Sequence, residues 1–462
     1  MQPAASDIKI PEKNMKKAHA LWQTPRTGLC TLVAVTALTV LGACAQTSRL
    51  PENAGYGPDP QLPEPQRALI PTVNVAEAVG WPEGAAPLPA QGLQVSRYAS
   101  GLDHPRWLYV LPNGDVLVAE TNAPKRPAED EKFKLKIMGH FMKKAGAGTP
   151  SADRITLLRD QDGDGHAEIK QPFLEKLTSP FGMALVKNHL YVANTDGVVR
   201  FPYTEGDTRI DAAGEKVTDL PAGPLNHHWT KNIVASSNGQ RLYATVGSNS
   251  NVGENGLDQE EGRAAIWEID LPGGEKRLFA TGLRNPNGMD WERESNELWT
   301  VVNERDELGS DLVPDYLTSV KKGVFYGWPY SYYGNIVDTR VQPQRPDLVA
   351  KAIKPDYALG AHTASLGLAF YNAELFPERY RGGAFIGMHG SWNREPPSGY
   401  KVVFVPFKDG KPNGMPQDIL TGFLNGEGKA QGRPVGVAID NRGALLVADD
   451  VGNVIWRVAP EQ

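Results

Sequence analysis

Cysteine is nearly absent from this chain of 462 residues, which contains only Cys30 and Cys44. Both precede the Pro-rich stretch that begins near residue 45, so the folded part has no disulfide, no cysteine-based metal site and no thiol nucleophile. The pattern Cys-x-x-Cys-His is also missing, which excludes a covalently attached c-type haem. The chemistry of this protein therefore depends on other side chains or on a bound group.

Long apolar runs are scarce as well. The uncharged run of residues 28–41 is shorter than the ~20 residues that cross a bilayer. It follows several lysines and ends in Leu-Gly-Ala-Cys at 41–44, the layout of a secretory signal with small residues at the cleavage site. This ending resembles a bacterial lipobox, in which Cys44 becomes the lipidated first residue. We expect residues 1–43 to be a lipoprotein-type signal peptide, with an uncleaved signal anchor as the alternative and Met15 as a possible start.

Excess positive charge is absent too. The formal net charge is −6, and removal of residues 1–43, which hold five Lys/Arg and two Asp/Glu, makes it −9. An acidic surface argues against nucleic-acid binding. With a lipid on Cys44, we expect the protein on the periplasmic side of a bacterial membrane, and Ala45 after the cysteine favours the outer membrane. Secretion without the lipid is the alternative.

Proline is concentrated in one place. Nine prolines fall between Pro51 and Pro89, among small and polar residues. Such a composition favours an extended segment. We expect residues 44–91 to be a Pro-rich tether and the folded domain to occupy residues 92–462.

A strand-turn-strand pattern recurs through that domain. It is seen first as 108–110, Pro112-Asn113-Gly114 and 116–120, and last as 435–438, Asn441-Arg442-Gly443 and 445–449. Six copies of the pattern are present. A small sheet formed by one copy cannot bury both of its faces unless neighbouring sheets pack against it. The sequence therefore predicts an all-β, six-bladed β-propeller, with two β-sandwiches as the alternative. Because the last copy shows about three strands, we expect residues 93–98 to complete it and join the two ends.

Three segments interrupt the pattern. Residues 132–144 place four apolar side chains on one helical face, which predicts a helix packed on the propeller rim, or less favoured, on a membrane surface. Residues 306–333 end in an aromatic loop that either lines a pocket or covers the core. Residues 160–165 have the oxygen ligands of the first half of a calcium loop, but Gln171 stands at its twelfth position. We expect a hairpin turn there, with or without a loosely held calcium ion.

In a propeller, equivalent positions of all blades converge on one mouth. Candidate site residues at or near such positions are His228, Arg284, Thr363, His389 and Arg433. A histidine with two arginines suits proton abstraction beside an anionic cofactor or a developing negative charge. Any one of them could instead tie neighbouring blades together, but their convergence favours a functional site.

Several motifs together resemble the glucose/sorbosone dehydrogenase family, most closely its sorbosone dehydrogenase branch, from about residue 75 onward. They are Gly101-Leu102-Asp103-His104-Pro105-Arg106, His228-Trp229-Thr230, Gly282-Leu283-Arg284-Asn285-Pro286, Tyr326-Gly327-Trp328-Pro329, His389-Gly390-Ser391-Trp392-Asn393-Arg394 and Gly432-Arg433-Pro434-Val435-Gly436. The resemblance implies a propeller that holds pyrroloquinoline quinone (PQQ) and calcium at its mouth and oxidises sugars.

The same resemblance implies roles for individual residues. His228 corresponds to the general base that takes the substrate hydroxyl proton, and Arg284 to the cation beside the quinone. Cofactor contacts are implied for Arg284, Asn285, Thr363, His389 and Arg433, the last with a cofactor carboxylate. Calcium is implied at the acidic loop 304–307, with Asp306 and Glu307 as the metal residues.

Two departures from the glucose-oxidising members of that family concern the substrate and the cofactor geometry. Ser248 is the nearest match to the acidic residue that stands behind the base in those members. The stretch His389-Gly390-Ser391 stands where those members have a lysine that contacts the quinone.

The predicted function is PQQ-dependent oxidation of a sugar or sugar aldehyde, of the aldose or sorbosone class. Electrons then pass to an external acceptor, a quinone or a cytochrome, because no haem is built in. One alternative is a propeller that serves as a non-catalytic binding module. Another is a metal-dependent propeller lactonase, which needs a carboxylate-rich central metal site that the His/Arg set fits less well.

Overall fold

The computed structural model describes residues 47–67, 72–125, 139, 141 and 143–461. The chain separates into two units, residues 1–44 and 45–462, and all the described strands belong to the second. The predicted signal peptide and most of the predicted helix 132–144 lie outside the described residues. Within the described ranges, no helix has both the length and the apolar character needed to cross a bilayer.

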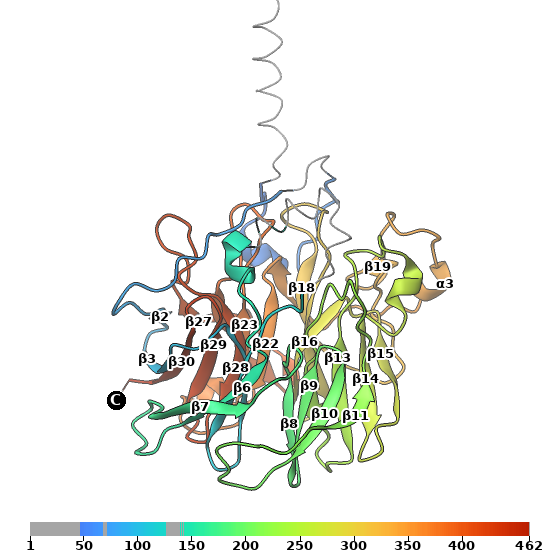
Figure 1. The fold of residues 1–462 in the computed structure, drawn as a ribbon. Helices are drawn as coiled ribbons and strands as arrows, with labels where there is room; N and C mark the ends of the chain where they lie inside the picture. The colour runs from blue at the N-terminus through green and yellow to red at the C-terminus, as the bar shows by residue number, and fades with distance from the viewer. Residues whose placement is uncertain (1–46, 68–71, 126–138, 140, 142, 462) are drawn as a thin grey trace, which may run out of the picture. The chain divides into compact units, whose positions relative to one another are not determined.

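Among the described residues, the second unit contains six antiparallel sheets of four or five strands (Figure 1). Two further sheets have two strands each, β19 (Ser331–Tyr332) with β20 (Ile336–Val337) and β25 (Phe407–Lys408) with β26 (Lys411–Pro412). Blade 1 contains β4 (Pro105–Val110), β5 (Val116–Glu120), β6 (Arg154–Arg159) and β7 (Ile169–Leu174). Blade 2 contains β8 (Met183–Val186), β9 (His189–Asn194), β10 (Gly197–Pro202) and β11 (Glu215–Asp219). Blade 3 contains β12 (Ile233–Ala235), β13 (Arg241–Val246), β14 (Ala265–Asp270) and β15 (Lys276–Thr281).

The remaining three blades follow the same plan. Blade 4 contains β16 (Asn285–Trp291), β17 (Leu298–Asn303), β18 (Pro314–Ser319) and β21 (Tyr357–Ala361). Blade 5 contains β22 (Ser365–Phe370), β23 (Ala384–Met388), β24 (Lys401–Val405) and β27 (Gln417–Thr421). Blade 6 contains β28 (Pro434–Ile439), β29 (Leu445–Asp449), β30 (Val454–Pro460) and β3 (Leu93–Ser100).

The innermost strands of the blades form a closed ring. β4, β8, β12, β16, β22 and β28 each contact the next, and β28 contacts β4. Glycine permits this close approach: a Cβ atom at Gly288 of β16 would lie 2.6 Å from the carbonyl oxygen of Leu366 in the next blade. The predicted six-bladed β-propeller is therefore confirmed.

The two ends of the propeller are joined in blade 6, as predicted. β3 pairs antiparallel with β30, from Leu93 opposite Pro460 to Ser100 opposite Val454. This pairing gives the last blade its fourth strand. A ring closed in this way hides the strand edges that would otherwise remain unpaired.

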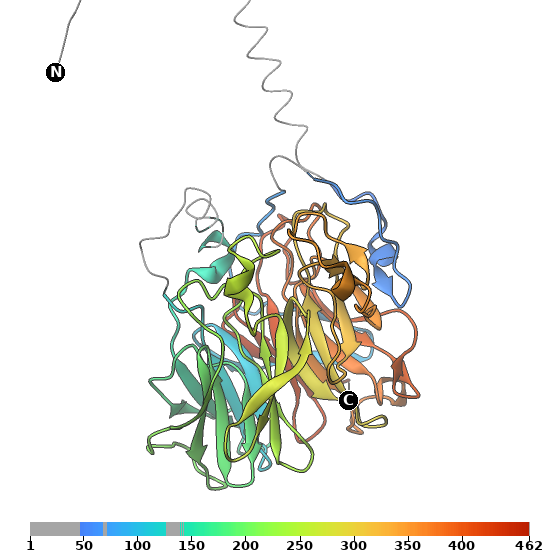
Figure 2. The same cartoon turned by 90° about the vertical axis from the view of Figure 1, so that its right-hand side faces the viewer.

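The N-terminal segment, residues 47–67 and 72–92, differs from the expected tether. Its short strands β1 (Tyr56–Gly57) and β2 (Leu88–Pro89) become fifth, outermost strands of blades 4 and 5. Figure 2 shows the blue part of this segment along the rim. Proline is tolerated at such edge positions because no ladder hydrogen bond is needed on the outer side. Tyr56 is buried, so the segment packs on the propeller instead of extending from it.

Two of the interruptions have defined places in the structure. The aromatic loop packs inward, with Tyr326, Trp328, Tyr332 and Tyr333 at most 4% exposed. Its three tyrosines belong to the hydrophobic cluster shared by blades 3 and 4. The acidic stretch that begins at Asp160 forms the turn between β6 and β7, and four of its carboxylates gather there. The long loops and short helices lie at the upper rim in Figure 1, which carries the mouth.

Candidate active site at the propeller mouth

The predicted site residues all come from segments at the mouth. His228, Arg284, Thr363 and Arg433 precede the innermost strands β12, β16, β22 and β28. Asn285 is the first residue of β16, and His389 follows β23. Their burial and hydrogen bonds differ, however, so their chemical possibilities differ too.

His228 is held in one tautomer. Its Nδ1 atom lies 2.8 Å from the carbonyl oxygen of Ser248 and 3.0 Å from the Ser248 hydroxyl oxygen. That hydroxyl donates to the carbonyl of Ser250, so it accepts from the imidazole. Two acceptors at Nδ1 place the ring proton there and leave the lone pair on Nε2. Ser248 thus lies on the Nδ1 side of the histidine.

The charge state of His228 follows from its surroundings. Burial lowers the pKa of the imidazole well below its usual value, and the positive charges of His227 and Arg284 lower it further. The rings of His227 and His228 meet edge to face, with centroids 4.7 Å apart. His228 is therefore neutral at neutral pH, with a basic nitrogen available for a proton.

Arg284 is a buried cation whose guanidinium is fixed from several sides. It donates to the carbonyl and side-chain oxygens of Asn251, at 3.1 and 2.9 Å, and to the carbonyl of Glu304 at 2.6 Å. Its charge is balanced by the carboxylate of Asp306 at 3.2 Å. A positive charge held in this way needs no reorganisation when negative charge develops nearby.

Asp306 is an organising carboxylate of the mouth. Besides Arg284, it accepts a hydrogen bond from Asn393 at 2.8 Å and lies 3.3 Å from the Nδ1 atom of His362. Burial alone would raise the pKa of Asp306, but the hydrogen bond from His362 and the charge of Arg284 outweigh it and hold the pKa at about 2. Glu307, its predicted companion, has an exposed side chain.

Thr363 has its side chain in the interior. It is 0% exposed, and its hydroxyl donates to Asp315 at 3.1 Å. The side chain is therefore committed to the protein, and the carbonyl of Thr363 accepts from the N–H of Gly390 at 3.0 Å. Asn285, in contrast, has a buried side-chain oxygen without a hydrogen-bond partner among the described residues.

A cluster around Asp450 completes the mouth between blades 5, 6 and 1. The Asp450 carboxylate is 2.7 Å from Arg106, 2.9 Å from the Nε2 atom of His389 and 3.5 Å from His104. Burial lowers the pKa of His389 to about 4, and the nearby Asp450 only partly offsets this effect. Arg433 is buried over the ring of Tyr400, 4.9 Å from its centroid.

Sequence reasoning included His389 and Arg433 but missed Arg106, His104 and Asp450 as site residues. Their positions in the repeat could have indicated them: Arg106 lies at the start of the first copy, and Asp450 directly follows residues 445–449 of the last copy. Ring closure brings these two positions together, although they lie far apart in the chain.

Several buried polar atoms of the mouth have no hydrogen-bond partner within the described residues. They are the Nε atoms of Arg106 and Arg433, the Nε2 atom of His104, and the side-chain oxygens of Asn285 and Asn393. A buried polar atom without a partner is costly, so such atoms mark places that a ligand or water completes. The two guanidinium groups fit an anion with planar carboxylates.

Two family models match the chain. A domain of unknown function, DUF7133, matches residues 112–390, and a TrAA12-like model matches residues 343–461. An uncharacterized protein of Borreliella burgdorferi is 30% identical over 297 residues, which cover 62% of this chain and 77% of that protein. The pyrroloquinoline quinone-dependent pyranose dehydrogenase of Coprinopsis cinerea is 24% identical over 363 residues, 69% of this chain. The chain spans 44% of the length of that relative.

Solved structures share the fold. The PQQ domain of the Coprinopsis cinerea pyranose dehydrogenase, in its holo form, superposes with a TM-score of 0.65 at 20% identity and covers 83% of this chain and 100% of that domain. A calcium structure of Trichoderma reesei Carbohydrate-Active Enzymes Family AA12 gives 0.65 at 19% identity, covering 84% and 99%. The resemblance to PQQ-dependent sugar dehydrogenases is confirmed by these relatives, and the sorbosone branch stays a prediction.

Proposed function

The chain belongs to the DUF7133 family, and from this premise we propose that it is an oxidoreductase, a PQQ-dependent sugar dehydrogenase. The observation that carries the proposal is the state of His228. Its imidazole is neutral, its Nδ1 atom is fixed by Ser248, and its Nε2 atom keeps the lone pair, as a general base requires. The relatives that use PQQ support the cofactor.

The residues of the mouth fit this cofactor. Arg106 and Arg433 have unpartnered Nε–H groups for carboxylates, and Asn285 has an unpartnered side-chain oxygen. The stretch His389-Gly390-Ser391 stands where the glucose-oxidising members have a lysine. In it, His389 is kept near Asp450 with a low pKa and contributes a neutral donor or acceptor. When bound, PQQ supplies the two-electron oxidant for the carbon that carries the substrate hydroxyl. Thr363 is proposed to contribute through its main-chain N–H only, because its carbonyl accepts from Gly390.

The catalytic step that the protein performs is a proton transfer. The Nε2 atom of His228 accepts the proton of the substrate hydroxyl, and the carbonyl of Ser248 stabilises the resulting imidazolium through Nδ1–H. Arg284, fixed by Asp306 and Asn251, presents a rigid positive charge beside it. General base catalysis of this kind contributes about 10²–10⁴-fold to a rate.

Calcium is proposed at the loop 304–307. Calcium favours carboxylate and carbonyl oxygens. The loop offers a buried oxygen of the Glu304 carboxylate that has no hydrogen-bond partner among the described residues. The Asp306 carboxylate already contacts Arg284, His362 and Asn393, so calcium would have to share it with them. Glu307 is exposed and would have to turn inward to contribute. The calcium-containing structure neighbour supports the metal.

The finer parts of the function are proposals as well. We propose that the substrate is an aldose or sorbosone and that a separate quinone or cytochrome takes the electrons. Export by residues 1–43 and lipid attachment at Cys44 would place this exchange on the periplasmic side of the membrane.

The test uses purified protein that begins after Cys44, with PQQ and Ca²⁺ added. PQQ binding is titrated, and dye reduction is followed with a panel of aldoses and sorbosone. We expect PQQ-dependent dye reduction that disappears in His228→Ala, with PQQ binding retained, and is unchanged in His189→Ala at the start of β9. A protein that binds no PQQ and reduces no dye would be a propeller with another role.

A further inference from the structure

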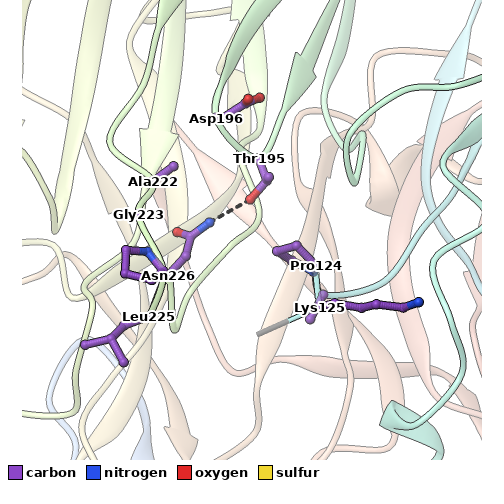
Figure 3. A pocket seen from close by; sticks show the side chains of 10 residues that line it. Pro124, Lys125, Thr195, Asp196, Ala222, Gly223, Leu225 and Asn226 are labelled. Carbon is purple, nitrogen blue, oxygen red and sulfur yellow. Dashed lines mark hydrogen bonds between the residues drawn. The ribbon is translucent and has the colours of Figure 1, made fainter. Parts of the chain in front are cut away.

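A pocket of about 260 Å³ opens at the mouth between blades 1, 2 and 3 (Figure 3). Its walls come from the loop after β5, the turn after β9 and the loop before β12. At about 30 Å³ for each molecule of liquid water, it holds the equivalent of about nine waters. This is the scale of one sugar ring with its hydroxyl groups.

The lining combines polar groups with apolar surface. Thr195 and Asn226 are buried, and the Asn226 amide donates to the Thr195 hydroxyl at 2.7 Å. Figure 3 shows this pair across from the Pro124 ring, with Asp196 nearby. The Asp196 side chain is exposed and makes no hydrogen bond or ion pair within the described part of the chain. Its carboxylate and the second N–H of the Asn226 amide are thus available to neighbouring hydroxyls of a ligand.

The pocket adjoins the proposed base. The Thr195 hydroxyl donates to the carbonyl of Trp229, the residue directly after His228, at 2.9 Å. Asn226 itself lies two residues before His228. A ligand that fills the pocket therefore lies beside the loop that carries the base.

The buried side chain of Arg263 connects the pocket wall with the segment that orients His228. Its guanidinium donates to the Asn226 side-chain oxygen at 3.1 Å and to the carbonyl of Gly247 at 3.3 Å. Gly247 precedes Ser248, which orients His228. One buried side chain thus fixes the pocket wall and the support of the base relative to each other.

From this arrangement we infer that the pocket binds the sugar ring of an uncharged monosaccharide, with Asp196 and Asn226 bonded to its hydroxyls and Pro124 against its apolar face. The inference rests on the proposed function for the reaction itself. It adds the place where the sugar ring is bound and two specificity-determining residues. Few polar groups in a partly apolar pocket are the usual means of fixing a small ligand.

Two variants test it by different means. Ala123→Trp fills the pocket from an exposed position on its wall. Asp196→Asn removes the negative charge of an exposed side chain and breaks no hydrogen bond within the described part of the chain. With the aldose that gives the fastest dye reduction, we expect KM to rise about tenfold or more in both, with kcat and PQQ affinity unchanged. Asp409→Asn, on the exposed hairpin of β25 (Phe407–Lys408) and β26 (Lys411–Pro412), is the matched control and should leave KM unchanged.

A second readout is independent of turnover. Saturation-transfer NMR with the same aldose reports binding to PQQ-free protein, and the signal should be lost in Ala123→Trp. Unchanged KM and unchanged NMR signal in both variants of an active enzyme would overturn the pocket and leave the proposed function intact. If the wild-type protein reduces no dye but gives an NMR binding signal that Ala123→Trp abolishes, the proposed function would be overturned and the binding pocket retained. Absence of both activity and binding would overturn both.

Discussion

The Nδ1 atom of His228 lies 2.8 Å from the carbonyl oxygen of Ser248, and this contact decides which ring nitrogen can accept a proton. A main-chain carbonyl can only accept, so Nδ1 keeps its hydrogen and Nε2 stays basic. The serine hydroxyl adds a second acceptor at 3.0 Å. In place of a charged residue, this protein uses neutral oxygens behind its base, which leaves the pKa of the imidazole low.

The first prediction concerns pH. Because burial and neighbouring positive charges lower the pKa of His228, kcat/KM should stay constant through neutral pH and fall only below about 6.5. The free energy of unfolding should also decrease below that pH, since the unfolded imidazole takes up a proton first. A pH–rate profile, with thermal unfolding measured at each pH, checks both. An acidic limb centred at or above 6.5 would contradict the assignment.

Replacement of Ser248, which contacts the Nδ1 atom of His228, should shift the acidic limb of the pH–rate profile. Ser248→Asp places a carboxylate beside the imidazole, which favours its charged form and should raise the midpoint of the acidic limb by roughly one pH unit or more. Ser237→Asp, in the exposed turn between β12 and β13, is the control and should leave the profile in place. If Ser248→Asp folds and keeps the wild-type profile, Ser248 does not act through His228.

Arg433 should affect cofactor binding more than folding. Its Nε–H has no partner among the described residues, and its guanidinium donates to the carbonyl of Ala76 at 3.3 Å. Arg433→Met removes the proposed hydrogen bonds between the guanidinium and a carboxylate of PQQ. In a titration, PQQ binding should weaken about 10–100-fold, with little change in Tm. Arg381→Met, an exposed arginine of blade 5, should bind PQQ normally. Equal affinity in the two variants would remove Arg433 from the cofactor site.

The N-terminal segment should contribute to stability. Trp81 donates to Asp449 at 2.7 Å and packs edge to face on Phe423 and Trp456. Because Trp81 is half-buried, Trp81→Ala should lower the free energy of unfolding by about 2–3 kcal/mol. Leu88→Ala, whose side chain is 63% exposed, should change it little. Denaturant unfolding measures both, and a free tether would show no loss in either variant.

Much of the fold was predictable because its signals are local and repeated. Pairs of short strands separated by turns recur six times, and a last copy with one strand too few calls for a strand from the other end of the chain. β3 pairs with β30 as that reasoning requires. The positions of His228, Arg284 and Arg433 before innermost strands follow from the same repeat.

Other features depended on contacts that no local pattern records. The Thr363 side chain turns inward and bonds to Asp315. Thr363 lies in the turn between β21 and β22, where His362 and Ala364 both have positive φ, so no strand periodicity in the sequence fixes its direction. The prolines of the N-terminal segment indicate extended backbone, but only the free outer edges of blades 4 and 5 decide that it is bound. Its composition is the same in either case.

The sequence by itself determined the repeat, the closure of the ring and the residue types available at the mouth. Tertiary structure alone decided how those residues are combined. Asp450 meets Arg106 and His389 only because the ring brings blades 5, 6 and 1 together, and His228 receives its tautomer only from the main chain of Ser248. Charge state and proton position depend on neighbours in space, and a propeller draws those neighbours from distant parts of the chain.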